Sequence, residues 1–450
     1  MRVVVTGGGI AGLAAALRLR EGLGRAARIT VVDQAARLGG KLRTEAFGDG
    51  YAEAGAEAFL VTDPAVVELA HRVGLGAALR HPAPVPAALA VGGELRPLPR
   101  GTLMGVPADP AAVADLAAVV PGADADGGRP LLGPGEDVSV GALVRARLGE
   151  AVLDRLVDPL LGGVYAGRGE GLSLAATVPA LAAACRTEST LTGAVRVALA
   201  GRSAPAGPVF ATVEGGMGRL VDAAAAASGA KLRLGAPVRH LARAGGAWRV
   251  GVGGQTLDAD AVVLAVPARP AARLLAEISP PAAAEIGVLD YASVALVTFA
   301  VRGARLPELS GFLVPASEGY AVKALTIFTT KWAHLARTDG LAVIRASVGR
   351  YGETAVLHRG DEELAALVHA ELGTLLGAAL PVPEAVRVTR WGGALPQYAP
   401  GHLDRVARAR GELADLPGLA LAGAAYAGVG IPACVRSGWA AAERLLGSDT

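Results

Sequence analysis

The chain opens with Arg2-Val-Val-Val-Thr-Gly7-Gly-Gly9-Ile-Ala-Gly12, and this stretch decides its fold. Residues 2–6 form a largely apolar run without alternation, which is typical of a strand buried on both faces. Ala and Leu at helical spacing follow from 13 to 20, and a second apolar run, residues 28–32, ends at Asp33. A strand, a glycine turn, a helix and a second strand in this order predict a βαβ unit that binds a dinucleotide.

Each glycine of the turn has its own physical role. Gly7 permits the tight turn, Gly9 lets the backbone approach a pyrophosphate, and Gly12 lets the helix pack closely on the strand. The N–H groups at the start of the helix would then face the phosphates. Asp33 follows the motif by about 20 residues, where a carboxylate is expected to meet a ribose hydroxyl. The alternative is a plain βαβ turn in which Asp33 caps a helix.

Two further segments favour a flavin over NAD. Gly39-Gly40-Lys41 follows the second strand, and a basic residue after two glycines lets the chain pass close to a flavin and its phosphates. Gly428-Val-Gly430-Ile-Pro432 places a proline near the first turn of a helix, whose start would favour the negative charge of a reduced flavin. A surface glycine turn and an ordinary proline-initiated helix are the alternatives. Together with the first turn, these segments predict FAD as the cofactor.

Composition removes several other classes of protein. The 450 residues predict about three domains, and 43 Lys+Arg against 41 Asp+Glu give a net charge of +2, which argues against nucleic-acid binding. Cys185 and Cys434 are too isolated for a disulfide scaffold, and the seven His lack metal-ligand spacing, so no metal site is expected. Mean hydropathy is high, at +0.42, but no uninterrupted apolar run reaches the roughly 18 residues of a membrane span. With no signal peptide expected either, the sequence predicts a globular cytoplasmic protein.

The rest of the chain suggests how the domains are arranged. Residues 110–200 show mostly helical periodicity, interrupted by a loop rich in Gly, Pro and Asp at 121–136. Alternating apolar runs between 296 and 348 predict a sheet. Near the C-terminus, the stretch 419–446 returns to a strand, a glycine-rich loop and a helix. We therefore expect the nucleotide domain to be split by insertions, with the C-terminus folding back on the N-terminus.

Further motifs are spread over nearly the whole chain. They are Gly55-Ala-Glu57-Ala-Phe59, Leu98-Pro-Arg-Gly101, Met104-Gly-Val-Pro107, Asp158-Pro-Leu-Leu-Gly-Gly-Val-Tyr-Ala-Gly167, Val262-Val-Leu-Ala-Val-Pro267, Gly311-Phe-Leu-Val-Pro315, Lys331-Trp332 and Ala425-Tyr-Ala-Gly-Val-Gly-Ile-Pro432. With them the chain resembles the oxygen-dependent porphyrinogen oxidases, which are flavoproteins of haem synthesis. It is most similar to the Gram-positive type, which oxidises coproporphyrinogen III to coproporphyrin III. The segments at Gly311 and Tyr426 are the specific ones, because they are not general flavoprotein motifs.

The resemblance implies an α/β (α+β) fold like that of the flavin amine oxidases. It combines a multi-segment Rossmann-like FAD-binding domain, a mixed-sheet substrate domain and a helical domain. The FAD-binding domain is expected at 1–75, 205–265 and 385–450, the substrate-binding domain at 76–108 and 266–384, and the helical domain at 109–204. Residues expected to contact FAD are Gly7, Gly9, Ile10, Ala11, Gly12, Asp33, Gly39, Gly40, Lys41, Ala56, Glu57, Ala58, Val238, Ala265, Gly423, Val429, Gly430 and Ile431.

The implied chemistry is carried by the flavin. Methylene-bridge C–H bonds of a porphyrinogen would pass hydride to the flavin in three two-electron steps, and O2 would reoxidise it to give H2O2. No catalytic side chain is assigned. Substrate carboxylates are expected to meet Arg100 first, with Arg43 and Arg168 as further candidates, although each could be a solvated surface arginine. Tyr165 and Gly163 could line the cavity or belong to a helix-ending turn.

Several alternatives stay open at this point. The substrate could be protoporphyrinogen IX, or the chain could be an amine oxidase in which Lys323 or Lys331 holds a water against the flavin. Both lysines could instead be surface residues at strand ends. A phytoene-desaturase-like enzyme and a non-catalytic partner-binding protein of the same fold are further possibilities. Contact with the inner face of the membrane and with a downstream chelatase would suit a porphyrinogen enzyme.

Overall fold

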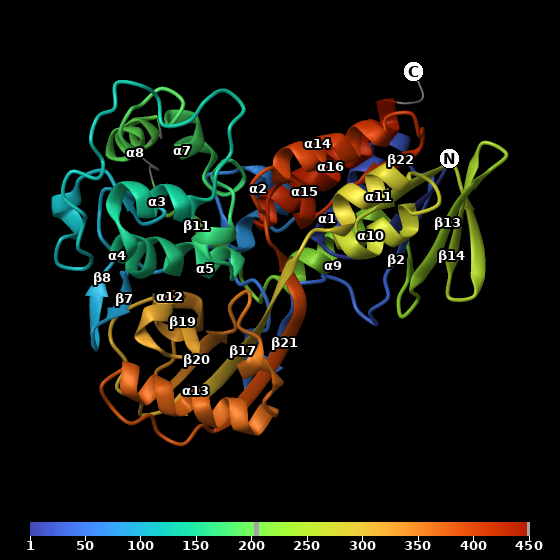
Figure 1. Cartoon of the computed structure of the whole chain (residues 1–450). Coiled ribbons are helices and arrows are strands. Elements are labelled where there is room, and N and C mark those ends of the chain that lie inside the picture. Colours follow the sequence, from blue (N-terminus) through green and yellow to red (C-terminus); the bar gives the residue numbers. More distant parts are fainter. Residues whose placement is uncertain (202–206, 448–450) are drawn as a thin grey trace.

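Strand β1 (Arg2–Thr6) lies at the centre of a five-stranded sheet in a computed structural model that describes residues 1–201 and 207–447. Every neighbouring pair in this sheet is parallel, as expected for a sheet built from βαβ units. The strand order is β12 (Lys231–Arg233), β2 (Arg28–Val32), β1, β16 (Ala261–Leu264) and β22 (Leu419–Leu421). Segments from the start, middle and end of the chain therefore share one sheet (Figure 1).

Helices cover one face of this sheet, and helices and strands cover the other. Buried side chains of α1 (Ile10–Leu23), α9 (Gly218–Ser228) and α16 (Ile431–Gly447) pack on the first face. The second face packs against α10 (Ala268–Leu275), α11 (Pro280–Gly287), α14 (His402–Glu412) and an antiparallel sheet of β13 (Val238–Ala244), β14 (Ala247–Val252) and β15 (Gln255–Ala259). A Cβ on Gly438 would lie 2.1 Å from the Ala11 carbonyl oxygen, so α16 and α1 pack too closely for a side chain there.

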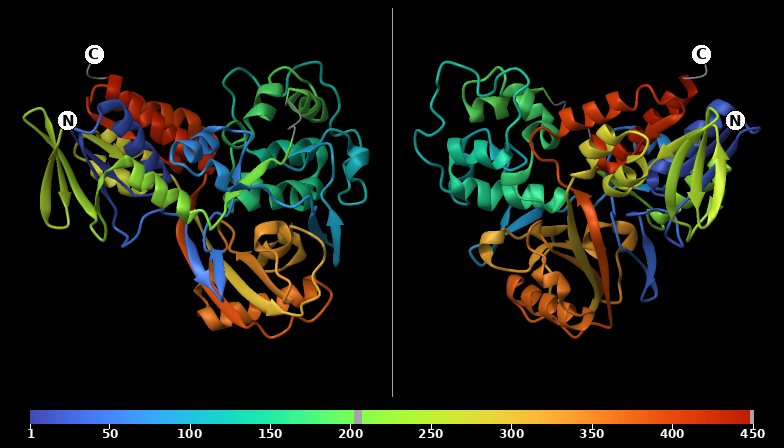
Figure 2. Two further views of the ribbon diagram at one scale, coloured as in Figure 1. Left: turned by 180° about the vertical axis from the view of Figure 1, so that it is seen from behind. Right: turned by 45° about the vertical axis from the view of Figure 1, so that its right-hand side comes forward.

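The second large element is a mixed seven-stranded sheet. Its order is β21 (Ala385–Pro396), β17 (Tyr291–Arg302), β20 (Leu341–Val348), β19 (Val322–Ile327), β18 (Gly311–Leu313), β7 (Ala87–Val91) and β8 (Glu94–Pro97). All pairs are antiparallel except β18 with β7. Helix α13 (Asp361–Leu375) packs on one face through an apolar stripe. Figure 2 shows α13 and most of this sheet in yellow to orange, with β7 and β8 in blue, below the helical part of the molecule.

The third part is helical and has its own apolar core. It contains α3 (Val140–Leu148), α4 (Glu150–Val152), α5 (Asp158–Tyr165), α6 (Leu174–Thr177), α7 (Pro179–Ala184) and α8 (Leu191–Ala200), with one wide turn at Leu153–Val157 leading into α5. Ser139 and Thr190 cap α3 and α8 by accepting N–H bonds from the first turn, as their positions before the helices favour. The predicted loop at 121–136 contains neither helix nor strand.

Short elements join these three parts. They are β3 (Thr44–Phe47), β4 (Gly50–Glu53), β5 (Phe59–Leu60), α2 (Ala65–Arg72), β6 (Leu79–Arg80), β9 (Thr102–Leu103), β10 (Val106–Pro107), β11 (Phe210–Val213), α12 (Phe328–Lys331) and α15 (Ala424–Ala427). None of the helices within the described ranges has the length and apolarity that crossing a membrane requires.

The packing differs from the expected domain division at two places. Strand β21 belongs to the seven-stranded sheet, because it pairs with β17 along most of its length, although residues 385–450 were expected in the FAD-binding domain. Helices α10 and α11 pack on the five-stranded sheet through buried side chains such as Leu275 and Ile286, although 266–384 was expected in the substrate domain. The expected boundary between 204 and 205 lies outside the described residues, and the rest of the division stays a prediction.

Candidate functional site

A glycine cradle lies at the carboxyl edge of the five-stranded sheet. Strands β1, β16 and β22 are parallel, so their ends bring Gly7, Ala265 and Gly423 to the same edge. A Cβ on Gly7, whose φ is 103°, would lie 2.3 Å from the Ala265 carbonyl oxygen. A Cβ on Gly12 would lie 2.0 Å from the Gly7 carbonyl oxygen. Both positions require glycine, as the sequence motif predicts.

The cradle opens onto free space at the start of α1. A Cβ built on Gly9 or on Gly423 meets no atom within 4 Å. Gly9 stands at the N-terminus of α1, where the first-turn N–H groups of Ile10 and Ala11 point along the helix axis. An opening without side chains, in front of a helix N-terminus, is the donor arrangement that a dinucleotide pyrophosphate requires. The residues present therefore fit such a group.

Asp33 organises the same cradle from the end of β2. Its Oδ2 accepts a hydrogen bond from the Gly8 N–H at 2.7 Å, and its Oδ1 accepts one from the Ala35 N–H at 2.8 Å. The carboxylate thus fixes the glycine turn and is half-buried beside it. Val238, the first residue of β13, is half-buried beyond the end of β12. Their contacts with ribose and adenine stay predictions.

The second glycine pair lies directly against the first. The Gly39 N–H donates to the Gly8 carbonyl oxygen at 2.8 Å, and a Cβ on Gly40 would lie 3.4 Å from the Gly9 Cα. The next residue, Lys41, lines a large cavity, and burial lowers the pKa of its ammonium. The glycine pair therefore carries the chain from the cradle to the cavity wall.

The C-terminal loop completes this edge. Helix α16 begins at Ile431, directly after Val429 and Gly430, as the proline signal predicts. The Tyr398 hydroxyl hydrogen-bonds to the Ala424 carbonyl and accepts from the Gly428 N–H at 3.1 Å, so it fixes the loop before the helix. No sequence pattern indicates this role, because Tyr398 lies well before the loop in the chain and outside every motif.

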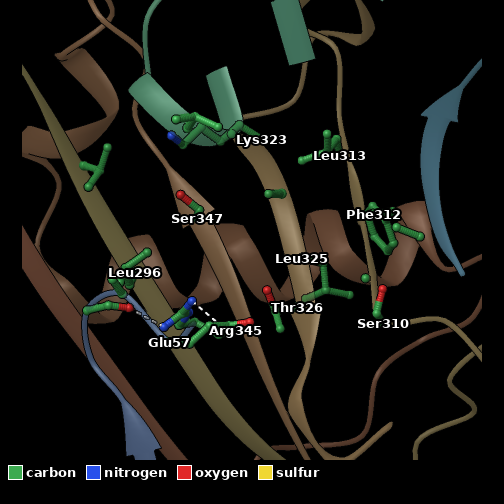
Figure 3. A pocket seen from close by; sticks show the side chains of 18 of the residues that line it. Glu57, Leu296, Ser310, Phe312, Leu313, Lys323, Leu325, Thr326, Arg345 and Ser347 are labelled. Carbon is green, nitrogen blue, oxygen red and sulfur yellow. Dashed lines mark hydrogen bonds and ion pairs between the residues drawn. The ribbon is translucent and has the colours of Figure 1, made fainter. Parts of the chain in front are cut away.

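The cavity of about 480 Å³ lies between the seven-stranded sheet, α5 and the segment 55–57 (Figure 3). This size falls within the range of small-molecule sites. Its lining is mostly apolar, with Ser310, Thr326 and Ser347 as neutral polar groups. The charged lining residues are Lys41, Glu57, Lys323, Lys331 and Arg345, and the remaining lining residues are Gly55, Ala56, Ala87, Leu98, Gly163, Val164, Val294, Leu296, Gly311, Phe312, Leu313, Ala324, Leu325, Trp391, Ala394 and Leu395.

A buried ion-pair network lies at one end of the cavity. Lys331 Nζ lies 2.5 Å from Glu57 Oε1, and Arg345 Nη2 lies 2.7 Å from Glu57 Oε2. Burial alone would raise the pKa of Glu57, but the two cations outweigh it and hold the pKa below its usual value. Both carboxylate oxygens are therefore used within the protein. The expected cofactor contact of Glu57, like those of Ala56 and Ala58, would have to use the backbone.

The same arginine holds the backbone beside that carboxylate. Arg345 Nη1 donates to the carbonyl oxygens of Glu53 at 2.6 Å and of Gly55 at 2.8 Å. Trp391 donates from its indole N–H to the Ala54 carbonyl at 2.7 Å. Residues 53–57 are thus fixed to the seven-stranded sheet. Sequence reasoning missed Arg345 and Trp391; the one available signal was a charge within the alternating apolar run of residues 341–348.

Glu53 is a second buried acid that the sequence did not single out. Its Oε1 accepts from the Met217 N–H at 2.7 Å and from the Thr44 hydroxyl at 2.9 Å. Burial raises the pKa of Glu53 to about 7. A Cβ on Gly216 would lie 2.2 Å from the Thr44 side chain, which explains the glycines before Met217. Glu53 therefore joins the hairpin of β3 and β4 to the start of α9.

The alternative that Lys323 and Lys331 are surface residues at strand ends is wrong. Lys323 is only 7% exposed, and its Nζ donates to the Gly162 carbonyl oxygen of α5 at 3.2 Å. Burial, together with the positive charge of Arg350, lowers the pKa of Lys323 to about 7. Lys331 is held by Glu57, as described above. The motif aromatics Phe59 and Trp332 belong to the core, since both are at most 2% exposed.

Of the five residues expected to contact the substrate, Gly163 lines the cavity and the other four do not. Arg100 is exposed on the loop between β8 and β9, just after the lining residue Leu98 and Pro99. Tyr165 is buried in the helical core with its ring edge against Tyr398, at 5.7 Å between centroids, and burial raises its pKa to about 12. Gly163 and Tyr165 therefore lie on different sides of α5.

The other two arginines, Arg43 and Arg168, are each occupied by a carboxylate. Arg43 donates from Nε to Glu45 at 2.5 Å, and Arg168 pairs with Glu353. Neither residue lines the cavity. Their roles in substrate binding stay predictions, but each would first have to leave an ion pair.

Comparison with known proteins places this arrangement in a family. The sequence profile described as flavin containing amine oxidoreductase matches residues 10–446. Coproporphyrinogen III oxidase of Mycobacterium tuberculosis is 40% identical over 436 residues, which cover 96% of this chain and 94% of the relative. The Bacillus subtilis enzyme of the same name is 31% identical, covering 99% and 97%.

Solved structures agree with the sequence relatives. A crystal structure from Exiguobacterium sp. 255-15, provisionally named a protoporphyrinogen oxidase, superposes with a TM-score of 0.86 at 31% identity, covering 99% of this chain and 98% of that one. A putrescine oxidase variant shares the fold at a TM-score of 0.73 and 18% identity, covering 99% and 98%. With its glycine cradle, its split parallel sheet and these matches, the chain belongs to the family of flavin-containing amine oxidoreductases.

Proposed function

We propose that this chain is an FAD-dependent coproporphyrinogen III oxidase, which forms coproporphyrin III with O2 as the acceptor and H2O2 as the product. One observation carries the proposal: the glycine cradle continues through Lys41 into an apolar cavity whose lining has four cations and one carboxylate. A large apolar ring with ionised propionates matches such a lining in both shape and charge. The names of the mycobacterial and Bacillus relatives support the same substrate.

FAD, rather than a smaller flavin, is proposed from the length of the cradle. It runs from the Lys41 wall through Gly9 to Asp33 after β2 and to Val238 at the start of β13. That span offers places for an isoalloxazine, a pyrophosphate, a ribose and an adenine in turn. When bound, the flavin would supply the redox chemistry, accepting hydride and returning the electrons to O2.

The contribution of the chain itself would be positioning and exclusion of water. The apolar walls formed by Leu296, Leu313 and Leu395 would exclude solvent from the ring. Glu57, Lys331 and Arg345 hold the segment 55–57 rigidly at one end of the cavity. No side chain is assigned as an acid or base, because the ring NH groups of a porphyrinogen can redistribute protons.

A direct test is aerobic porphyrin fluorescence from the purified protein, supplied separately with coproporphyrinogen III and protoporphyrinogen IX. We expect faster formation of coproporphyrin than in enzyme-free controls, with about one H2O2 for each two-electron step. Mass spectrometry of the released cofactor should give FAD. A clear preference for protoporphyrinogen would reassign the substrate. Activity with neither, but with primary amines, would favour the amine-oxidase alternative, and a colourless protein would favour a partner-binding role.

Other parts of the expectation remain proposals. A cytoplasmic location, contact with the inner face of the membrane and transfer of product to a chelatase are consistent with this reaction. Co-purification with membranes and with a porphyrin-metallating enzyme would test the last two.

A further inference from the structure

The distribution of lysine in this chain is uneven. The sequence contains four lysines, Lys41, Lys231, Lys323 and Lys331, against 39 arginines, since Lys+Arg total 43. Three of the four line the cavity, and the exposed Lys231 in β12 is the exception. Lys331 is neutralised by Glu57. Lys323 lies at the α5 end of the cavity, opposite Glu57 and Arg345 (Figure 3).

An irregularity in β19 aims Lys323 at the cavity. Val322 pairs with Val348 and Ala324 pairs with Ser347, so Lys323 is an extra residue with no partner of its own on β20. In a regular strand, Lys323 would share the face of Leu325 and Ile327, which pack on α13. The extra residue lets Val322 fill that core position and releases Lys323 to the cavity side. Bulges of this kind commonly redirect a side chain beside a functional site.

The Lys323 ammonium has no counterion in the described part of the chain. Its one hydrogen bond goes to a neutral acceptor, the Gly162 carbonyl oxygen, and its charged neighbour Arg350 has the same sign. Lys323 also lines a small adjoining pocket with Asp158, but within the described residues the two form no ion pair, and Asp158 Oδ1 accepts from the Gly169 N–H at 2.7 Å. A buried cation without a partner is costly, and an anionic ligand would remove that cost.

We propose that Lys323 binds one carboxylate of the substrate at the α5 end of the cavity, and thereby selects porphyrinogens that carry a propionate at that position. The inference rests on the proposed function, because it takes a porphyrin carboxylate as the anion. Under this proposal, the substrate carboxylate is recognised by Lys323 before an exposed arginine such as Arg100. The competing role is structural: Lys323 would only cap the carbonyl groups at the end of α5.

Equilibrium binding separates these two roles without turnover. Coproporphyrin III and its tetramethyl ester are titrated into the flavin-loaded protein, followed by porphyrin fluorescence. The variants are Lys323→Met, which keeps the length and removes the charge, and Lys323→Arg, which keeps the charge. Lys231→Met is the matched control, because it removes an exposed lysine far from the cavity. Flavin content and thermal unfolding are recorded for each, so that a folding defect is recognised.

We expect Lys323→Met to weaken binding of the free acid at least tenfold and to leave binding of the ester within twofold. Lys323→Arg should recover most of the acid affinity, and Lys231→Met should match the wild type. Equal affinities of wild type and Lys323→Met for the acid would overturn the inference while leaving the proposed function intact. Equal losses for acid and ester would assign Lys323 the structural role. Absence of porphyrin binding to the wild type would instead reject the proposed function, and the inference with it.

Discussion

The Arg345 guanidinium lies 2.7 Å from the Glu57 carboxylate and simultaneously hydrogen-bonds two backbone carbonyls of the segment that carries Glu57. Side chain and backbone of residues 53–57 are thus fixed by one residue of the seven-stranded sheet. This contact joins the part of the chain next to the glycine cradle to the wall of the cavity. Any movement of the sheet would therefore be transmitted to residues 53–57.

Replacement of Arg345 by Leu should destabilise the protein by about 3 kcal/mol. This value is at the low end for breaking a buried ion pair, because Lys331 remains beside Glu57. Denaturant unfolding measures the change. Arg302→Leu is the control, since its pair with Glu384 is nearly half exposed on both sides and should contribute much less to stability. Similar losses for the two variants would contradict a special role for Arg345.

Replacement of Gly9 by Ala should leave the fold intact and weaken flavin binding at least tenfold, or ~1.4 kcal/mol. The added methyl meets no protein atom within 4 Å and φ is −74°, so the apoprotein can accept it. It would occupy the space reserved for the pyrophosphate. Flavin fluorescence during reconstitution measures the affinity, with Gly50→Ala as the control because its Cβ is also free of contacts. Unchanged affinity in Gly9→Ala would place the cofactor elsewhere.

The affinity for coproporphyrin should fall as pH rises above about 7. The pKa of Lys323 is lowered to about 7, so the ammonium form that binds a carboxylate is depleted above that value, by up to tenfold per pH unit. The other charged groups near Lys323 are Arg350, Arg168 and Asp158, and burial raises the pKa of Asp158 to about 6. Titrations between pH 7 and 9 therefore lie above the range in which Asp158 loses its proton. Lys323→Arg should flatten the profile, and an equally steep profile in that variant would exclude Lys323 as its source.

Glu53→Gln should change how stability depends on pH. The folded pKa of Glu53 is about 7, above its usual value near 4.5, so the folded state binds a proton that the unfolded state has released. The contribution of Glu53 to folding stability is complete below about pH 4.5 and is lost as the pH rises through 7. Gln keeps the acceptor for the Met217 N–H. The free energy of unfolding of the variant should therefore rise relative to that of the wild type between pH 5 and 8. Urea unfolding at several pH values measures this change. A difference in stability between variant and wild type that does not vary with pH would contradict it.

The glycine cradle could be predicted from the sequence because its information is local. Gly7, Gly9 and Gly12 lie within six consecutive residues, and their spacing alone predicts the role of each. The order of strand, turn and helix at both ends of the chain was equally clear, and with it the shared sheet. The family resemblance then supplied the number and kind of the remaining domains.

The cavity could not be predicted in the same way, because its charged residues are brought together by pairing between distant strands. Arg345 and Lys323 lie on neighbouring strands of one sheet. Glu57, which pairs with Arg345, comes from a segment near the start of the chain. The position of Lys323 further depends on one extra residue in β19, which no periodicity indicates. The arginines were predicted from residue type and, for Arg100, from the Leu98–Gly101 motif, whereas Arg43 and Arg168 are held by glutamates.

The packing of the two ends of the chain against each other also determines when the fold can be completed. Strand β1 pairs with β16 from the middle of the chain, and α1 is covered by α16 from its C-terminal end. While the chain emerges from the ribosome, the apolar side of α1 has no cover and the glycine turn lacks its Ala265 and Gly423 neighbours. Pairing over such separations is slow and exposes surfaces prone to aggregation. We therefore expect flavin to bind only after α16 has been synthesised and has packed on α1.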